Sequence, residues 1–366
     1  MPLNLHIFSF FAGSGFLDLG FERADYTIDL VNEFSPSFSA AYQYARQQMG
    51  MPAPQFGYTR DVNDYLQGRG NELRQQIRGI RQQGDTLVGF IGGPPCPDFS
   101  VAGKQKGRNG DNGKLSLSYV TLIRRMLPDF FLFENVKGLW QTARHRAYYE
   151  ELKQSLDRNY FLVDRLTNAL EFGAPQDRDR ILLFGVKKCV ARRLHLDIAN
   201  FDFERYSLYN LEDIKNLPWP GQTPFVPNVA TPCPAGIPEE LTAQYWFEHN
   251  DVEHHPNGQD FFTPRAGLIR MQTVQEGDDS KKCYKRIHRW RYSPTACYGN
   301  NEVHLHPYKE RRLSVAETLA LQSLPPEFCL PPDMTLSDKF KTVGNGVPFL
   351  LANGVARAIS DFLNNQ

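Results

Sequence analysis

Residues 90–100 read Phe-Ile-Gly-Gly-Pro-Pro-Cys-Pro-Asp-Phe-Ser. Residues 86–91 predict a short buried strand, because most of them are apolar or β-branched and two glycines follow at once. The two prolines after Gly93 stiffen the chain and prevent a helix. Cys96 is therefore expected on a rigid loop at the carboxyl end of a strand, where ligands bind in an open α/β sheet. A thiolate held there is a candidate nucleophile, although a lone cysteine near a turn is also commonly a small buried hydrophobe.

The composition limits the class of protein. The 366 residues are enough for one large domain or two ordinary ones, and a hydrophobic fraction of 41% supports a substantial core. The formal net charge is zero, so attraction to nucleic acid would depend on local basic patches. No apolar run is long enough to span a membrane, and the first residues lack the features of a signal peptide. The 6 cysteines show no metal-ligand spacing, which predicts reduced thiols, a cytoplasmic location and no metal site.

The first part of the chain has the layout of a nucleotide-cofactor site. A predicted strand at 5–10 leads into Phe11-Ala12-Gly13-Ser14-Gly15 and then into a helical apolar pattern, although a plain tight turn would look the same. A second predicted strand ends in Asn32-Glu33-Phe34. An acid at this position usually holds a ribose diol, and Phe34 is placed to stack on an adenine; the alternative for Glu33 is an exposed acid at a helix N-terminus. Asp61 and Val62 mark a third candidate position on the same rim.

Two later segments carry charged residues at strand ends. Residues 130–133 predict an apolar strand that ends in Glu134-Asn135-Val136, and burial beside apolar side chains should raise the pKa of the Glu134 carboxyl. Such a group can hold or donate a proton at neutral pH. Before the predicted strand at 181–186, alternation puts Arg178 and Arg180 on one face. Two fixed guanidinium groups suit a carbonyl or a phosphate, although a surface ion-pair ladder would give the same pattern.

The order of elements predicts the fold. Strands and helices alternate up to Val186, which is typical of an α/β protein with a doubly wound sheet. From residue 187 the chain becomes rich in proline and turn residues. We therefore expect a larger domain at 1–187, completed by 335–366, and a smaller loop-rich domain at 188–334. Within these, Ser314 and Glu317 have the spacing of a helix capping box, and a last amphipathic helix is expected from about 349 to 362.

Two basic stretches are candidate contacts with nucleic acid. Residues 281–291 are the densest basic run, with Tyr284 and Trp290 interleaved among the charges, which is typical of a surface that contacts a nucleic-acid backbone. The glycine- and lysine-rich loop at 103–107 could contact phosphates. A solvated surface is the alternative for both. The candidate residues are Lys104, Lys106, Lys282, Lys285, Arg286 and Arg289.

Taken in order, these motifs resemble those of C5-cytosine DNA methyltransferases. The matching motifs are Phe11-Ala12-Gly13-Ser14-Gly15, Pro95-Cys96, Glu134-Asn135-Val136, Gln176-x-Arg178-x-Arg180, the helix with Ser314 and Glu317 that follows Arg312, and Gly344-Asn345-Gly346-Val347-Pro348. The resemblance covers nearly the whole chain, and residues 187–291 correspond to the variable target-recognition region. Four positions depart from the usual pattern of the family: Ser9 replaces Asp, Phe16 replaces Gly, Pro97 replaces Gln and Leu321 replaces Arg.

The resemblance implies a Rossmann-like methyltransferase sheet and a transfer of methyl from S-adenosylmethionine to C5 of a flipped cytosine in double-stranded DNA, with S-adenosylhomocysteine as product. It assigns Cys96 to the attack on C6 of the cytosine. It assigns Glu134 to protonating N3 or donating a hydrogen bond to it. Arg178 and Arg180 complete the set of catalytic residues. Arg180 would hold the O2 side of the cytosine and stabilise the charge that develops there. Asn135 and Asn345 would brace the Cys96 loop, and the 103–107 loop would close over the base. The expected cofactor residues are Phe11, Ala12, Gly13, Ser14, Gly15, Glu33, Phe34, Asp61, Val62, Pro94, Leu115, Asn345 and Val347.

Several alternatives stay open at this point. One branch of the resembled family methylates tRNA, and a catalytically silent DNA-binding homologue would share much of the pattern, although intact Cys96, Glu134 and Arg180 argue against it. Without the resemblance, the second interpretation would be an oxidoreductase that binds its cofactor at the Gly-x-Gly turn. The sequence gives neither the target site nor a partner such as a restriction nuclease or another anti-phage system. Zero net charge and the lack of a heptad pattern favour a monomer.

Overall fold

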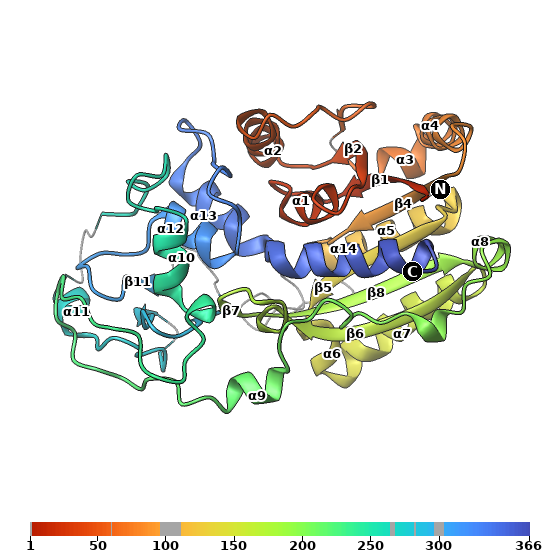
Figure 1. Ribbon diagram of the computed structural model, residues 1–366. Coiled ribbons are helices and arrows are strands. Elements are labelled where there is room, and N and C mark those ends of the chain that lie inside the picture. Colours follow the sequence, from red (N-terminus) through yellow and green to blue (C-terminus); the bar gives the residue numbers. More distant parts are fainter. Residues whose placement is uncertain (1, 60, 96–110, 264–267, 282, 296–303) are drawn as a thin grey trace.

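The computed structural model describes residues 2–59, 61–95, 111–263, 268–281, 283–295 and 304–366. Within them the chain forms a lobe built on a large sheet and a second, loop-rich lobe beside it (Figure 1). The predicted site residues Cys96, Lys104, Lys106 and Lys282 lie outside the described residues, as does the whole 103–107 loop.

The large sheet has the strand order β3-β2-β1-β4-β5-β8-β6. Its strands are β1 (Asn4–Phe10), β2 (Thr27–Asn32), β3 (Tyr58–Thr59), β4 (Thr86–Gly92), β5 (Phe130–Val136), β6 (Tyr160–Asn168) and β8 (Asp179–Lys187). Neighbouring strands from β3 to β5 pair in parallel, whereas β8 runs antiparallel to both β5 and β6. The strand order reverses between β1 and β4, and ligands of open α/β sheets bind at such a switch point.

The reversed strand matters for the site. Because β8 runs against its neighbours, its first residues lie at the edge where the other strands end. The fold class predicted from the sequence is confirmed, with this one reversed strand as the difference. Alternation of strands and helices indicates a parallel sheet. It does not reveal that β6 and β8, which follow one another in the large sheet, are joined without a crossover α-helix.

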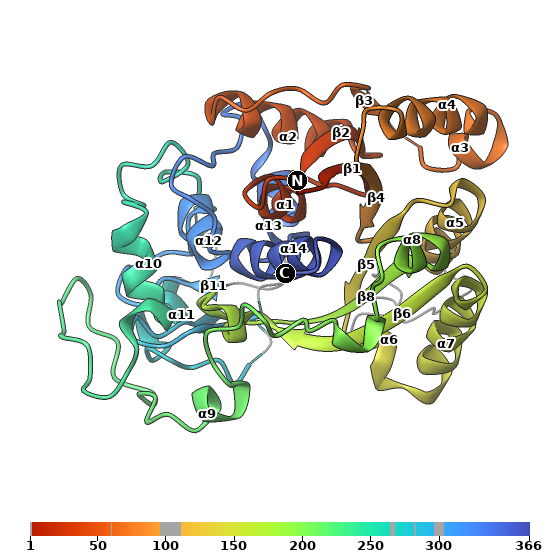
Figure 2. The same cartoon turned by 45° about the vertical axis from the view of Figure 1, so that its right-hand side comes forward.

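Helices cover both faces of the sheet, which explains why all 7 residues of β4 are buried and mostly apolar. One face packs against α1 and α14, which lie side by side (Figure 2), and α4, α5 and α7 pack on the other. The helices of this lobe are α1 (Phe16–Glu22), α2 (Pro36–Gln48), α3 (Asp64–Gln67), α4 (Gly70–Arg81), α5 (Asp111–Met126), α6 (Gly138–Gln141), α7 (Ala143–Asp157), α8 (Lys188–Arg193) and α14 (Phe349–Leu363), with the 3₁₀ helices η2 (Ala169–Phe172) and η3 (Ile198–Asn200).

The second lobe consists mainly of loops, as its proline and turn residues predicted. Its helices are α9 (Leu211–Lys215), η4 (Glu239–Leu241), α10 (Ala243–His249), α11 (Leu268–Thr273), α12 (Val315–Leu321) and α13 (Leu336–Asn345). The two-residue strands are β7 (Gln176–Asp177), paired with β10 (Ser293–Pro294), and β9 (Lys285–Arg286), paired with β11 (His304–Leu305). The predicted capping box at the start of α12 is present in both directions between Ser314 and Glu317.

Core packing bears on the division into domains. Phe201 and Phe203 pack in the apolar cluster of the sheet and α14, so the packing favours a boundary after 203 over one after 187. Phe340 and Val343 of α13 pack in a second cluster, which includes α12 of the second lobe. The same cluster includes Phe16 of α1 and Ala41 of α2, so α13 packs against both lobes. The assignment of separate functions to the two parts stays a prediction.

Candidate functional site

The turn between β1 and α1 needs glycine for two separate reasons. Gly13 and Gly15 have φ of 57° and 82°, and Phe11 before them has a φ of 56°. A Cβ on Gly15 would also lie 2.5 Å from the Tyr42 ring. The Ala12 N–H donates to the Asn32 carbonyl over 3.1 Å, which joins this turn to the end of β2. The Gly turn, as we call residues 11–15, therefore has a fixed place at the carboxyl edge of the sheet.

Glu33 follows β2 and is tied to the Gly turn. Its carboxylate accepts hydrogen bonds from the Gly13 N–H at 2.8 Å and the Ser35 N–H at 2.7 Å. Burial raises the pKa of Glu33, and these hydrogen bonds oppose the rise. The side chain is thus buried against the turn and is not an exposed helix acid. Next to it, the Phe34 side chain is 72% exposed, so this large apolar ring is available to a partner outside the chain.

The other predicted cofactor residues lie around this edge with different exposures. Val62 and Val347 are buried in the core, so a ligand would meet their backbone and not their side chains. Asp61 is half-buried and accepts from the Asn63 N–H, while Leu115 is half-buried on α5. Asn345 is exposed at the end of α13.

Thr342 is a residue of this edge that the sequence did not reveal. The Oγ1 of Thr342 lies 2.7 Å from the Oγ of Ser14, which links α13 directly to the Gly turn. Ser14 is 1% exposed, so this hydrogen bond is shielded from water. The only signal in the sequence was its position just before the Gly344-Asn345-Gly346 motif.

Glu134 and Arg180 form a buried ion pair near the end of β5. The antiparallel register pairs Val136 with Arg180, so Arg180 sits diagonally across from Glu134 on the same face. The Arg180 Nε lies 2.6 Å from the Glu134 Oε1, and the two side chains are 6% and 9% exposed. Glu134 lies within β5 and not just beyond it as predicted, because the strand continues to Val136.

The loop that leads to Cys96 packs directly on this pair. A Cβ on Gly93 would collide with the Glu134 carboxylate, so glycine here lets the carboxylate approach the backbone. The Asn135 Nδ2 donates to the Pro94 carbonyl at 3.4 Å, in line with the predicted bracing role of Asn135. The last described residues before Cys96 are therefore in contact with both Glu134 and Asn135.

Burial sets the protonation behaviour of Glu134. Desolvation raises the pKa of its carboxyl, and the positive charges of Arg180 and Arg178 oppose that rise. The net effect is a carboxyl that keeps its proton to higher pH than an exposed glutamate does. A buried acid beside a guanidinium group can both hold a proton and orient a polar ring.

Arg178 lies close enough to Glu134 to affect its pKa, but it makes different hydrogen bonds from Arg180. Its side chain is buried, and its Nη2 donates to the carbonyls of Gly344 at 2.6 Å and Gly346 at 2.9 Å. Backbone carbonyls thus accept from the Nη2 of Arg178, and a contact of its guanidinium with a substrate stays a prediction. The carbonyls at the end of α13 lack helix partners, and a cation there satisfies them. Arg178 thus fastens the turn that carries Asn345.

The basic stretch at 281–291 also differs from the prediction. Arg286 is 0% exposed and donates to the carbonyls of Met271, Val274 and His306, while its guanidinium lies 3.7 Å from the centre of the Phe225 ring. Arg289 is 5% exposed and pairs with Glu276. Both were predicted to contact DNA, and their burial removes them from that set. Lys285, immediately before Arg286, is half-buried and stays a candidate.

His254 and His255 are adjacent in the loops of the second lobe. His254 is exposed beside Asp251, whereas His255 is half-buried and hydrogen-bonded to the Phe328 carbonyl. In the ranges that the structure describes, no cluster of three or more His, Cys, Asp or Glu is arranged to hold a metal ion. Nor does any helix in those ranges have the length and apolar character needed to cross a membrane.

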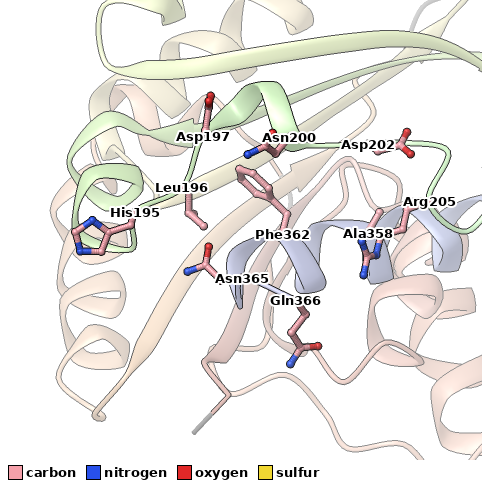
Figure 3. Close-up of a pocket in the computed structure, with 10 residues that line it drawn as sticks. All are labelled: His195, Leu196, Asp197, Asn200, Asp202, Arg205, Ala358, Phe362, Asn365 and Gln366. Carbon is pink, nitrogen blue, oxygen red and sulfur yellow. The ribbon is translucent and has the colours of Figure 1, made fainter.

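A cavity of about 230 Å³ lies elsewhere in the fold (Figure 3). It is lined by six residues between 195 and 205, by Phe362 near the end of α14 and by Asn365 just after that helix. The Gly turn lies at the opposite end of α14, near Val347. None of the predicted site residues lines this cavity, so it is separate from the edge that carries Glu33 and Glu134.

Comparisons with known proteins add four findings. The family model described as C-5 cytosine-specific DNA methylase matches residues 5–361. Type II methyltransferase M.NmeDI of Neisseria meningitidis serogroup C is 52% identical over 364 residues, covering 98% of this chain and 84% of that protein. Type II methyltransferase M.FnuDI of Fusobacterium nucleatum is 28% identical over 374 residues, covering 99% and 96%. The solved structure of S. pombe Dnmt2 methyltransferase matches with a TM-score of 0.58 at 13% identity, and the match covers 99% of each chain. At this identity the match supports only a shared fold.

Proposed function

The chain belongs to the C-5 cytosine-specific DNA methylase family and is a DNA cytosine-5 methyltransferase, and from this premise we propose its substrate and mechanism. It transfers methyl from S-adenosylmethionine to C5 of a cytosine that is flipped out of a short, specific sequence of double-stranded DNA. The observation that carries the proposal is the buried Glu134–Arg180 pair, which packs against the loop before Cys96 and lies at the same sheet edge as the Gly turn.

The described residues at this edge fit an adenosyl cofactor. Around the missing Cβ of Gly13 the nearest atom is the Thr342 Oγ1 at 3.9 Å, which leaves room for a ligand to approach the backbone. The Glu33 carboxylate suits a ribose diol, and the exposed Phe34 ring suits a flat base. When bound, S-adenosylmethionine supplies an electrophilic methyl group. The residues proposed to hold it are the Gly turn, Glu33 and Phe34, with Asp61, Leu115 and Asn345 at the rim.

Cytosine C5 needs activation before it can accept a methyl group. We assign the Cys96 thiolate, from its place in the sequence, to form a bond to C6, which moves electron density toward C5 and N3. Glu134 holds a proton toward N3, since burial keeps that proton on the carboxyl to higher pH. Arg180 donates toward O2, where negative charge develops. After C5 is methylated, a base removes the C5 proton and the S–C6 bond breaks, which restores the aromatic ring and the free thiolate.

The names of the relatives support a biological setting for this activity. Both curated relatives described above are named Type II methyltransferases, which supports a modification role beside a restriction nuclease. We propose double-stranded DNA as the macromolecular substrate for the same reason. Pairing with another anti-phage system, a monomeric state and a cytoplasmic location stay predictions from the sequence.

Sequencing at single-base resolution tests the proposal. Plasmid DNA is incubated with purified protein and S-adenosylmethionine, and 5-methylcytosine is mapped. We expect methylation at one recurrent short sequence, and none with Cys96→Ser, although that variant should still bind S-adenosylhomocysteine and DNA. Substantial turnover by Cys96→Ser would remove Cys96 as the nucleophile. A wild-type protein that binds cofactor yet methylates no plasmid cytosine would overturn duplex DNA as substrate, and tRNA would be assayed next.

A further inference from the structure

A buried polar cluster lies behind the Gly turn, on the side away from its open face. Arg46 of α2 is at its centre, with a side chain that is 3% exposed. Around it lie Glu22 and Asp18 of α1 and Tyr42 of α2. Neither the motifs of the family nor the proposed mechanism uses Arg46, and nothing in its sequence surroundings marked it.

Arg46 donates directly to the backbone of the Gly turn. Its Nη2 lies 2.6 Å from the Gly15 carbonyl and its Nη1 lies 3.3 Å from the Ser14 carbonyl. The same guanidinium binds the Glu22 carboxylate through Nε at 3.1 Å and Nη2 at 2.7 Å. A planar fork of five N–H donors can serve two carbonyls and a carboxylate at once, which a lysine ammonium on a flexible stem cannot reproduce.

The support behind Arg46 is itself fixed by hydrogen bonds. The guanidinium carbon lies 4.1 Å from the centre of the Tyr42 ring, and the Tyr42 hydroxyl donates to Asp18 at 3.0 Å. Ser9, which stands where the resembled family usually has Asp, donates to the other oxygen of Asp18 at 2.8 Å. The missing Cβ of Gly15 leaves the space that the Tyr42 ring and Arg46 occupy. The cluster therefore has little freedom to rearrange.

The position of Arg46 along α2 connects the cluster to the segment with Glu33 and Phe34. The helix begins at Pro36, three residues after Glu33, and Arg46 lies near its other end, at about 15 Å by the helical rise. The helix is rigid over this length. One helix thus holds the segment with Glu33 and Phe34 at its start and the carbonyls of the Gly turn near its end.

We infer that Arg46 is a positioning residue for the adenosyl cofactor, because it locks the Gly turn onto α2 and so fixes the turn relative to Glu33 and Phe34. The inference rests on the proposed function, in which these two segments hold S-adenosylmethionine. Without the hydrogen bonds from Arg46, the Gly turn, which has several positive φ angles, should relax toward commoner backbone conformations. Cofactor affinity should then fall while the DNA site stays intact.

The test uses the full chain and S-adenosylhomocysteine as the probe. Its Kd is measured by calorimetry for wild type, Arg46→Lys, Arg46→Met and the matched control Arg81→Met. Arg81 makes the same kinds of contact, to the Asp129 carboxylate and the Leu127 carbonyl, but at the other edge of the sheet. We expect Kd to rise about tenfold or more in both Arg46 variants, which is about the loss of one charged hydrogen bond, and to stay near wild type in the control.

Kinetics separate positioning from general destabilisation. The KM for S-adenosylmethionine should rise in the Arg46 variants while the KM for DNA stays unchanged. If Arg46→Met does not fold, Arg46→Lys and Glu22→Gln carry the test, and Glu22→Gln should show a smaller rise of the same sign. A wild-type Kd in folded Arg46 variants, or an equal rise in Arg81→Met, would overturn the inference. A wild-type protein that binds no S-adenosylhomocysteine would overturn the proposed function first.

Discussion

The charged side chains at the carboxyl edge of the sheet and those in the basic stretch of the second lobe have different roles. At the sheet edge, Glu33 and Glu134 are buried beside the Gly turn and the loop before Cys96, where we propose that the cofactor and the cytosine bind. In the second lobe, Arg286 and Arg289 point inward and bind carbonyls and Glu276. The same types of residue thus serve a candidate site in one region and hold the fold together in the other.

Backbone hydrogen bonding explains the difference. In the sheet, paired strands satisfy nearly all N–H and C=O groups, so side chains at the strand ends are left to bind other molecules. The strands β9 and β11 are two residues long, and the loops around them expose many carbonyls to the lobe interior. A buried arginine with five donors satisfies several of these carbonyls. A run of basic residues in a loop-rich segment therefore indicates a DNA surface less reliably than a charged residue at the end of a parallel strand.

The largest effect is expected at Glu134. Glu134→Gln keeps the shape of the side chain but cannot transfer a proton, so kcat should fall by about 10²–10⁴-fold. Burial favours the protonated carboxyl, and that form is lost as pH rises through the raised pKa. Wild-type kcat should therefore decline as the pH rises, and the kcat of the variant should not show this decline. Single-turnover methylation measured across pH checks both.

Binding measurements control the Glu134 experiment. The variant should bind S-adenosylhomocysteine as wild type does, because Glu33 and the Gly turn are unchanged. A variant that retains more than about a tenth of wild-type kcat would show that the ion pair with Arg180 is structural, and the contrast between the two regions would weaken.

The second effect is a loss of stability at Arg286. Replacing it by Met leaves the Met271, Val274 and His306 carbonyls without their donor, so the free energy of unfolding should fall by about 3 kcal/mol. The half-buried neighbour Lys285 is the control, and Lys285→Ala should cost less than about 0.5 kcal/mol. Urea unfolding of both variants gives the comparison.

The salt dependence of DNA binding distinguishes the two kinds of basic residue. Each cation that contacts a phosphate contributes to the slope of affinity against salt, so Lys285→Ala flattens it if Lys285 touches DNA. A stable Arg286→Met with a flatter slope would contradict our structural assignment and restore this residue to the DNA surface.

The smallest effect is expected at Phe34. Because its side chain is 72% exposed, Phe34→Ala should change stability by less than about 0.5 kcal/mol. Loss of a stacking platform costs about 1 kcal/mol per base, so the Kd for S-adenosylhomocysteine should rise about fivefold. Leu208 is 69% exposed and lies outside the site, so Leu208→Ala is the matched control. Equal Kd values in the two variants would exclude stacking on Phe34.

Local patterns located most of the elements that carry the site. The strand before Gly92, the Gly turn, the capping box at Ser314 and the last helix were all predicted from spacing, because each depends on residues close in sequence. The placement of Glu33 and Glu134 at one edge followed from the rule for parallel strands. Burial of Arg286 and the contacts of Arg178 were not predictable, because their partners come from segments 12 or more residues away.

The sequence by itself determined the family, the class of fold and the residue types at the strand ends, since periodicity, glycine positions and motif order are local properties. Only the tertiary structure decided that β8 is reversed, that Arg180 pairs with Glu134 while Arg178 fastens the end of α13, and that Arg46 supports the Gly turn. The reason is that a charged side chain takes its partner from whatever the fold brings within about 3 Å, and sequence spacing does not specify that neighbour.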